Sequence, residues 1–140
     1  MHIKLCCVAT VLALSGCSNS MKDIANPSAA QEQAAEMAYR NLRDGQFDDF
    51  LTHLEPELAT HFQDNQKIMK KFAREIPKGE YKSKTLMVKQ IEKSTAAPSQ
   101  YKVSYEIAYP KNLVQYDVSF DQPNGSTKIR NFNIQVFGGS

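Results

Sequence analysis

The feature that most constrains the fold of this chain is a strict alternation of apolar and other residues in its C-terminal half. Every odd position from residue 101 to residue 109 is Tyr, Val or Ile, whereas the even positions carry Lys, Ser, Glu and Ala. A period of two places successive side chains on opposite faces of a β-strand. The alternation recurs over residues 114–120 and, in shorter runs, over 86–91 and 132–136. The sequence therefore predicts four strands, each with one apolar face.

The segments between these predicted strands are short and rich in turn residues. They read Ala-Ala-Pro-Ser (96–99), Tyr-Pro-Lys-Asn (109–112) and Gln-Pro-Asn-Gly (122–125), and Asn-Gly is a strong hairpin signal. Because none of them can hold a crossover helix, the strands are predicted to form an antiparallel meander.

Two further expectations concern the phase of the strands. Alternation over residues 86–91 would place Leu86 and Val88 on one face, and Met87 and Ile91 on the other. Ile129 lies out of phase with the last strand, which indicates a bulge or bend near residues 130–131.

The N-terminal half has a helical period instead. Ser28 and Gln31 match a capping box, and Gly45 suits the left-handed position after a helix end, which predicts a helix over about 29–44. Its apolar stripe comprises Ala34, Ala35, Ala38 and Leu42, with Met37 beside them. Shorter helical segments follow over 47–54 and 56–62, and a last one, capped by Asp64, ends before Pro77. Helices followed by a meander define an α+β fold, with the helices packed on a curved four-stranded antiparallel sheet.

The first 17 residues are unlike the rest. An apolar run of ten residues over 5–14 is too short to cross a bilayer, which takes about 20 residues. It has the length of a signal-peptide core. It leads into Leu-Ser-Gly-Cys17, which resembles a bacterial lipobox. That resemblance implies cleavage before Cys17 and acylation of this residue, so that the chain is held on a membrane; the alternative is an ordinary signal peptide with an incidental cysteine.

The domain organisation follows from this assignment. Residues 1–16 are the expected signal peptide, 17–27 the lipidated cysteine and its tether, and 28–140 one domain. Cys6 and Cys7 would leave with the signal peptide, so the mature chain would have no thiol for a disulfide. By the same resemblance, Ser18 after the cysteine implies an outer-membrane lipoprotein facing the periplasm of the cell envelope.

Charge and candidate ligating residues exclude several functions. A net charge of only +2 argues against nucleic-acid binding. His53 and His61 have no third ligand at a recognisable spacing, so neither a metal site nor a cofactor is expected. The acidic residues that a general base would require are interpreted as caps or solvent-facing groups, so no enzyme is expected; they are Asp48, Asp49, Glu106 and Asp117. A basic run is expected to be a solvated helix face near the tether, or else a contact for anionic lipid or peptidoglycan: Lys67, Lys70, Lys71 and Arg74.

A row of tyrosines is the candidate ligand site. Tyr101, Tyr105 and Tyr109 share one face of a strand, and Tyr116 is expected to join them from the next strand. A buried tyrosine hydroxyl needs a hydrogen-bond partner. The row is therefore expected to be either core or the lining of a ligand cavity with polar groups at its rim.

Residues 43–51 carry a resemblance to a family. Arg-Asp-Gly-Gln-Phe47, followed by Phe50 and Leu51, is similar to the opening of NTF2-like (cystatin-like) bacterial lipoproteins of uncharacterised, lumazine-binding-like families. The likeness covers about 28–137 and implies a cone whose open end holds a small ligand or a peptide. Those families often have Gly-x-Trp-x-Ile in the last hairpin, but residues 125–129 contain no Trp.

Three functions are compatible with these observations. The first is an envelope lipoprotein whose non-catalytic domain binds a small apolar ligand or a protein partner. The second is an inhibitor or immunity-type lipoprotein, which predicts a filled core and an exposed binding face, and the third is a small isomerase or hydrolase. Because Lys102, Ser104 and Glu106 make the open sheet face polar, a monomer is expected.

Overall fold

The computed structural model describes residues 21–93 and 95–139. The expected signal peptide (1–16), the lipidated Cys17 and the first residues of the tether lie outside the described residues. The described helices are η2 (Met21–Asp23), α1 (Ala29–Arg43), α2 (Phe47–Thr52), α3 (Pro56–Asp64) and α4 (Gln66–Glu75). The strands are β1 (Ser83–Glu92), β2 (Gln100–Ala108), β3 (Asn112–Phe120) and β4 (Asn131–Gly138). Within this part of the chain, no helix is long and apolar enough to span a bilayer.

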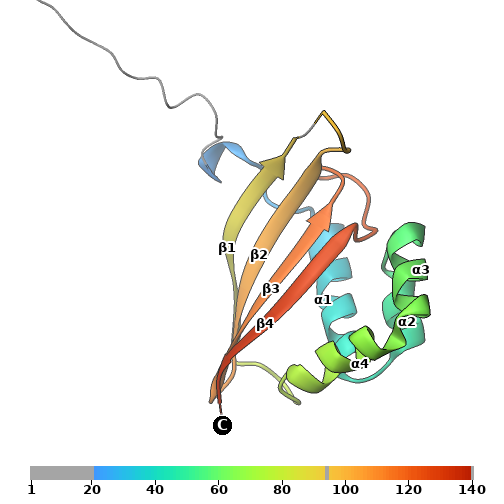
Figure 1. The fold of residues 1–140 in the computed structure, drawn as a ribbon. Helices are drawn as coiled ribbons and strands as arrows, with labels where there is room; N and C mark the ends of the chain where they lie inside the picture. The colour runs from blue at the N-terminus through green and yellow to red at the C-terminus, as the bar shows by residue number, and fades with distance from the viewer. Residues whose placement is uncertain (1–20, 94, 140) are drawn as a thin grey trace, which may run out of the picture.

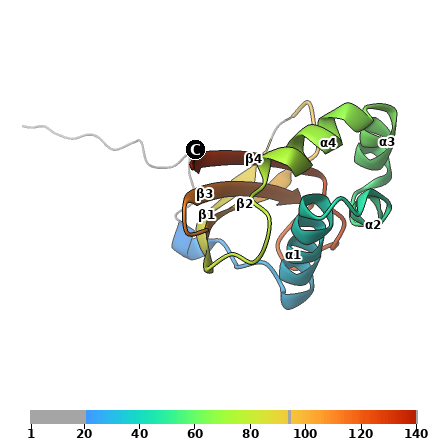
Figure 2. The ribbon, with the colours of Figure 1, turned by 90° about the horizontal axis from the view of Figure 1, so that it is seen from below.

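The predicted α+β fold is confirmed. The strands pair in the order β1-β2-β3-β4, and every neighbouring pair is antiparallel, as the short turns predict. Figures 1 and 2 show the four α-helices gathered on one side of the sheet. The sheet thus has a helix-covered face and an open face, and these two names are kept below.

Helix α1 begins and ends as its sequence predicts. The Ser28 hydroxyl accepts from the Gln31 backbone N–H, and the Gln31 side chain accepts from the Ser28 N–H, both at 3.1 Å. Gly45, just beyond the end of the helix, has a φ of +76°. By contrast, Asp64 does not cap α4, because it is the last residue of α3; Asn65 separates the two helices.

Strand β1 contains a bulge that the sequence pattern did not indicate. The β1–β2 register shifts between Leu86 and Val88, so that Met87 and Val88 are both exposed while Leu86 and Ile91 both pack against the core. The predicted split of these residues between faces is therefore wrong, since one extra residue inverts the side-chain phase. The β3–β4 register is unbroken from Asn131 onward, and the predicted irregularity near residues 130–131 lies just before it, where the Arg130 N–H donates at 2.8 Å to the carbonyl of Ser119, the partner of Asn131.

Ile129 is out of phase with β4 because it pairs outside the sheet. It forms a parallel bridge with Leu54, its N–H donates to the His53 carbonyl at 2.8 Å, and its carbonyl accepts from the Glu55 N–H at 2.9 Å. This pairing ties the loop before β4 to the α2–α3 connection and buries the Ile129 side chain.

Two groups of packing contacts hold the helices on the sheet. On β4, Phe132 contacts one ring from each of α2, α3 and α4, at centroid distances of 5.3, 5.2 and 5.3 Å: Phe50, Phe62 and Phe72. On β2 and β3, the tyrosines pack against α1, which buries Ala35, Ala38, Tyr39 and Leu42. The expected stripe of α1 is thus only partly right, since Met37 is exposed.

The expected tether also packs on the sheet in part. Ile24 is buried, and Lys89 of β1 donates to the Ile24 carbonyl at 2.7 Å and to the Asn26 side chain at 2.9 Å. The folded unit therefore extends further toward the N-terminus than the predicted boundary at residue 28.

Candidate functional site

The four tyrosines of the predicted ligand site all lie on the helix-covered face and are buried. Tyr105 and Tyr116 are paired across β2 and β3, with ring centroids 6.2 Å apart, and Tyr101 and Tyr109 flank them along β2 and its end. The structure thus brings the predicted residues together, as the strand phase indicated.

Each of the four hydroxyls has a partner within the protein. Tyr101 donates to the Ala25 carbonyl at 2.6 Å, and Tyr116 donates to the Ala35 carbonyl at 3.0 Å. Tyr105 donates to the Glu32 carboxylate at 3.0 Å. The hydroxyls therefore attach the sheet to α1 and to the segment before it.

The fourth tyrosine pairs with a residue that the sequence pattern did not single out. The Tyr109 and Tyr39 hydroxyls are 2.8 Å apart, and the Tyr39 ring lies 5.2 Å from the Tyr116 ring. Burial raises the pKa of Tyr101 to about 12 and also raises the pKa values of Tyr39, Tyr105 and Tyr116. These phenols stay protonated at neutral pH and act as hydrogen-bond donors rather than bases.

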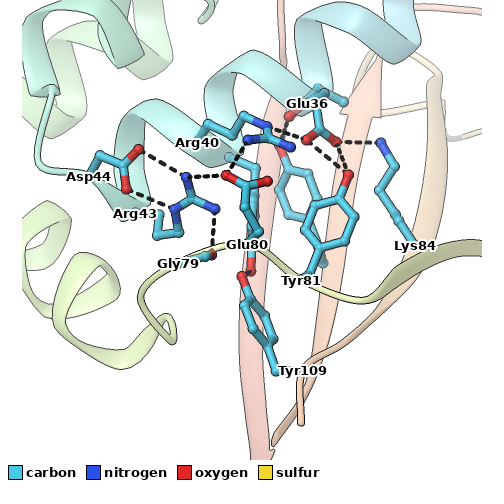
Figure 3. Close-up of polar contacts among 12 residues, drawn as sticks. Glu36, Arg40, Arg43, Asp44, Gly79, Glu80, Tyr81, Lys84 and Tyr109 are labelled. Carbon is cyan, nitrogen blue, oxygen red and sulfur yellow. Dashed lines mark hydrogen bonds and ion pairs between the residues drawn. The ribbon is translucent and has the colours of Figure 1, made fainter.

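A polar network beside the tyrosines is centred on Glu36 of α1 (Figure 3). Its carboxylate accepts from Arg40 at 2.6 Å, from Lys84 at 2.7 Å and from the Tyr81 hydroxyl at 3.0 Å. Burial alone would raise the pKa of Glu36, but the hydrogen bonds from Lys84 and Arg40 outweigh it, and the pKa lies below its ordinary value. The sequence offered one signal for this network, the i,i+4 spacing of Glu36 and Arg40.

Arg43, at the end of α1, forms the second part of this network (Figure 3). Its guanidinium is nearly buried and donates twice to Asp44, at 2.8 and 3.0 Å, and once to the Gly79 carbonyl at 2.8 Å. The guanidinium holds the pKa of the Asp44 carboxyl below its ordinary value. The Lys78 ammonium donates to the Arg43 and Ala73 carbonyls at 2.5 and 2.8 Å. Arg43 thereby joins the end of α1 to the loop before β1.

The two histidines have different surroundings. His53 has its Nε2 atom 3.1 Å from the Asn41 side-chain oxygen, and burial together with nearby Lys128 lowers its pKa. His61 is exposed and contacts Phe62 edge-on. Within residues 21–93 and 95–139, no group of three or more His, Cys, Asp or Glu residues could hold a metal ion.

The four carboxylates considered as general bases are not gathered in one place. Asp48 and Asp49 are exposed in the first turn of α2. Glu106 and Asp117 are half-buried on the open face, opposite in phase to the tyrosines, and Asp117 accepts from Gln115 at 3.2 Å. Glu106 and Asp117 thus lie on the predicted face, but the capping role expected for Asp48 and Asp49 is wrong, because the N-cap of α2 is Gln46 and no side chain makes a cap hydrogen bond there.

The basic run of α4 lies elsewhere than expected. Lys67, Lys70, Lys71 and Arg74 are exposed, as predicted for a solvated face. Figure 1 shows α4 at the lower end of the sheet, whereas η2 lies at the upper end. The expected position near the tether is therefore wrong, because the antiparallel meander puts the two segments at opposite ends of β1.

The open face carries an apolar patch that the sequence did not indicate. A hollow of about 260 Å³ is lined by polar Glu106 and Gln115 and by four exposed apolar side chains: Met87, Val88, Leu113 and Phe137. Leu113 and Phe137 are direct cross-strand neighbours, and Phe137 is 49% exposed. The patch depends on the β1 bulge, which turns Met87 and Val88 outward together.

Comparison with family models, with curated proteins and with solved structures gives no match for this chain.

Proposed function

We propose that this protein is an envelope lipoprotein, anchored through Cys17, whose non-catalytic NTF2-like domain binds a protein partner on the open face of its sheet. The N-terminal sequence supports the anchor. The apolar patch of Met87, Val88, Leu113 and Phe137 is the observation that carries the binding role. A contiguous exposed apolar patch on a small domain is a mark of an interaction surface.

The helix-covered face favours a protein partner over a small ligand. All four predicted ligand-binding tyrosines are buried, with hydroxyls bound to protein groups. An apolar molecule entering between them and α1 would separate these pairs and leave buried hydroxyls without partners, which costs about 1–3 kcal/mol each. Ligand contact by Tyr101, Tyr105, Tyr109 and Tyr116 stays a prediction, and the patch is the better-supported site.

The two edges of the sheet indicate the side from which the partner approaches. Strand β1 has a bulge and two lysines, Lys84 and Lys89, that point toward the helix-covered face, which are devices that protect an edge strand. Strand β4 has an unbroken register and contains no charged residue or proline. Because Phe137 of the patch belongs to β4, we expect the partner to cover the patch from the β4 edge.

The test is site-specific photocrosslinking of the full chain in its host envelope. A photoreactive phenylalanine analogue at position 113 or 137 is expected to trap one protein species, whereas the same analogue at exposed Asp48, on the helix side, is not. Met87→Ser should reduce the yield from position 113. Equal trapping at position 48, or no trapping at 113 and 137, would refute the proposed face.

An inhibitory role is the second candidate, since a filled interior with an exposed sheet face is what that role predicts. If the trapped partner is an enzyme, its activity is measured with the wild-type chain and with Phe137→Ser. Inhibition by the wild type alone would establish this role.

The anchor is tested separately: radiolabelled palmitate should enter the wild-type chain but not Cys17→Ser, and label in the variant would refute the anchor.

A further inference from the structure

A second surface, on the helix side of the molecule, is unusually basic. The end of α1, the start of α2 and the α4 helix enclose an open hollow of about 820 Å³. Four cations from three segments border it: Arg43, Lys70, Arg74 and Lys78. Its only carboxylate among the described residues is Asp44, which already accepts two hydrogen bonds from Arg43. The hollow therefore concentrates positive charge in a chain whose net charge is only +2.

The cations that border the hollow differ in how they are held. Lys78 and Arg43 are fixed by hydrogen bonds to backbone carbonyls. Lys70 and Arg74 are exposed, and within the described part of the chain neither makes a hydrogen bond or an ion pair. Spaced four residues apart, they lie on one side of α4. Lys70 and Arg74 thus have donors free for a ligand, and they border the same hollow as Arg43 and Lys78, whose side chains are held by the backbone.

The remaining border of the hollow is apolar and open. Phe47 and Ala73 supply apolar surface, and a Cβ atom added at Gly45 would meet no atom of the described residues within 4 Å beyond its chain neighbours. We propose that this hollow binds an anionic amphiphile. Its phosphate or carboxylate group binds Lys70, Arg74 and Lys78, and the adjoining part of its chain lies on Phe47 and Ala73. Charge-assisted hydrogen bonds to such anions are among the stronger contacts in water.

The test uses the full chain held in phosphatidylcholine nanodiscs and titrated with hexyl phosphate by calorimetry. We expect saturable binding that inorganic phosphate and hexanol each reproduce only weakly. Lys70→Gln with Arg74→Gln should weaken it about tenfold or more, because two charge-assisted bonds are lost. The matched control, Lys67→Gln with Lys71→Gln, removes the same charge from α4 outside the hollow and should change the affinity less than twofold.

Three results would overturn the proposal. The first is equal loss of affinity in both double variants, which would mean diffuse attraction rather than a site. The second is binding of inorganic phosphate as tight as that of hexyl phosphate, which would exclude the apolar contact. The third is no binding of hexyl phosphate at all. This result would overturn the proposal even if the basic residues of α4 bind to the surface of phosphatidylglycerol nanodiscs. If hexyl phosphate binds but the protein shows no affinity for phosphatidylglycerol nanodiscs, the site is supported and its ligand is a free amphiphile rather than a membrane lipid.

Discussion

The two faces of the sheet differ in how far their aromatic side chains are exposed to solvent. On the helix-covered face, Tyr116 is 3% exposed, and its hydroxyl is bound to the backbone of α1. On the open face, Phe137 is 49% exposed and lies directly across from Leu113 on the neighbouring strand. The comparison teaches that the tyrosines stabilise the fold by joining sheet to helix, whereas the open face retains apolar surface that the fold does not use.

The largest effect is expected on the helix-covered face. Tyr116→Ala removes a buried ring in contact with Tyr39 and Tyr105, and should lower the free energy of unfolding by about 3–5 kcal/mol. Urea denaturation followed by circular dichroism measures it. Tyr116→Phe, which removes only the hydroxyl, should cost about 1 kcal/mol. A loss under 1 kcal/mol for the alanine variant would mean that the tyrosine row is not core.

A smaller effect is expected from the polar network at the rim of the same face. Glu36→Gln weakens the bonds from Arg40, Lys84 and Tyr81 and should cost about 1–2 kcal/mol at pH 7. Because the pKa of Glu36 is lowered in the folded state, the unfolded chain takes up the proton first as pH falls below 4.5.

The stabilisation by Glu36 is thus present above about pH 4.5 and lost at lower pH. Chemical denaturation at pH 3, 5 and 7 should show the wild type and Glu36→Gln converging toward acid pH. A constant difference across that range would contradict the proposed ionisation.

His53 should contribute a weaker pH dependence. Its pKa is lowered by burial and by Lys128, so the unfolded chain binds a proton first as pH falls below 6.5, and stability decreases. The loss is expected to be smaller than that from Glu36, because His53 has one side-chain partner, Asn41, rather than three. His53→Gln should flatten the slope of stability between pH 7 and pH 5, and an unchanged slope would assign it to another group.

The smallest effect on stability, but the largest on binding, is expected on the open face. Leu113→Ser with Phe137→Ser should change the free energy of unfolding by less than about 0.5 kcal/mol, because both side chains are partly exposed in the folded state, at 37% and 49%. The same variant should abolish the crosslink to the partner that a photoreactive phenylalanine analogue at position 88 is expected to form on the open face. A loss of several kcal/mol would show that the patch belongs to the core and would remove the contrast between the faces.

Much of the fold could be predicted because its signals are local. The capping box at Ser28, the left-handed Gly45 and the alternation through Tyr105 each depend on neighbours within a few residues, and all three were confirmed. The β1 bulge was missed because Leu86 to Ile91 contains no turn residue to indicate it. The bonds of Glu36 to Tyr81 and Lys84, and of Tyr39 to Tyr109, were missed because the partners lie 45 or more residues away in the chain.

The sequence by itself determined the apolar faces of β2, β3 and β4, where the turns fall and that the strands run antiparallel, since periodicity and chain length leave few alternatives. Only the tertiary structure decided that the tyrosine hydroxyls bind α1, that Met87 and Val88 join Leu113 and Phe137 in one patch, and that the α4 cations surround a hollow with Arg43. The physical reason is that these groups meet through packing between distant segments. A one-residue bulge or the direction of one helix changes which of them meet, without altering the local pattern.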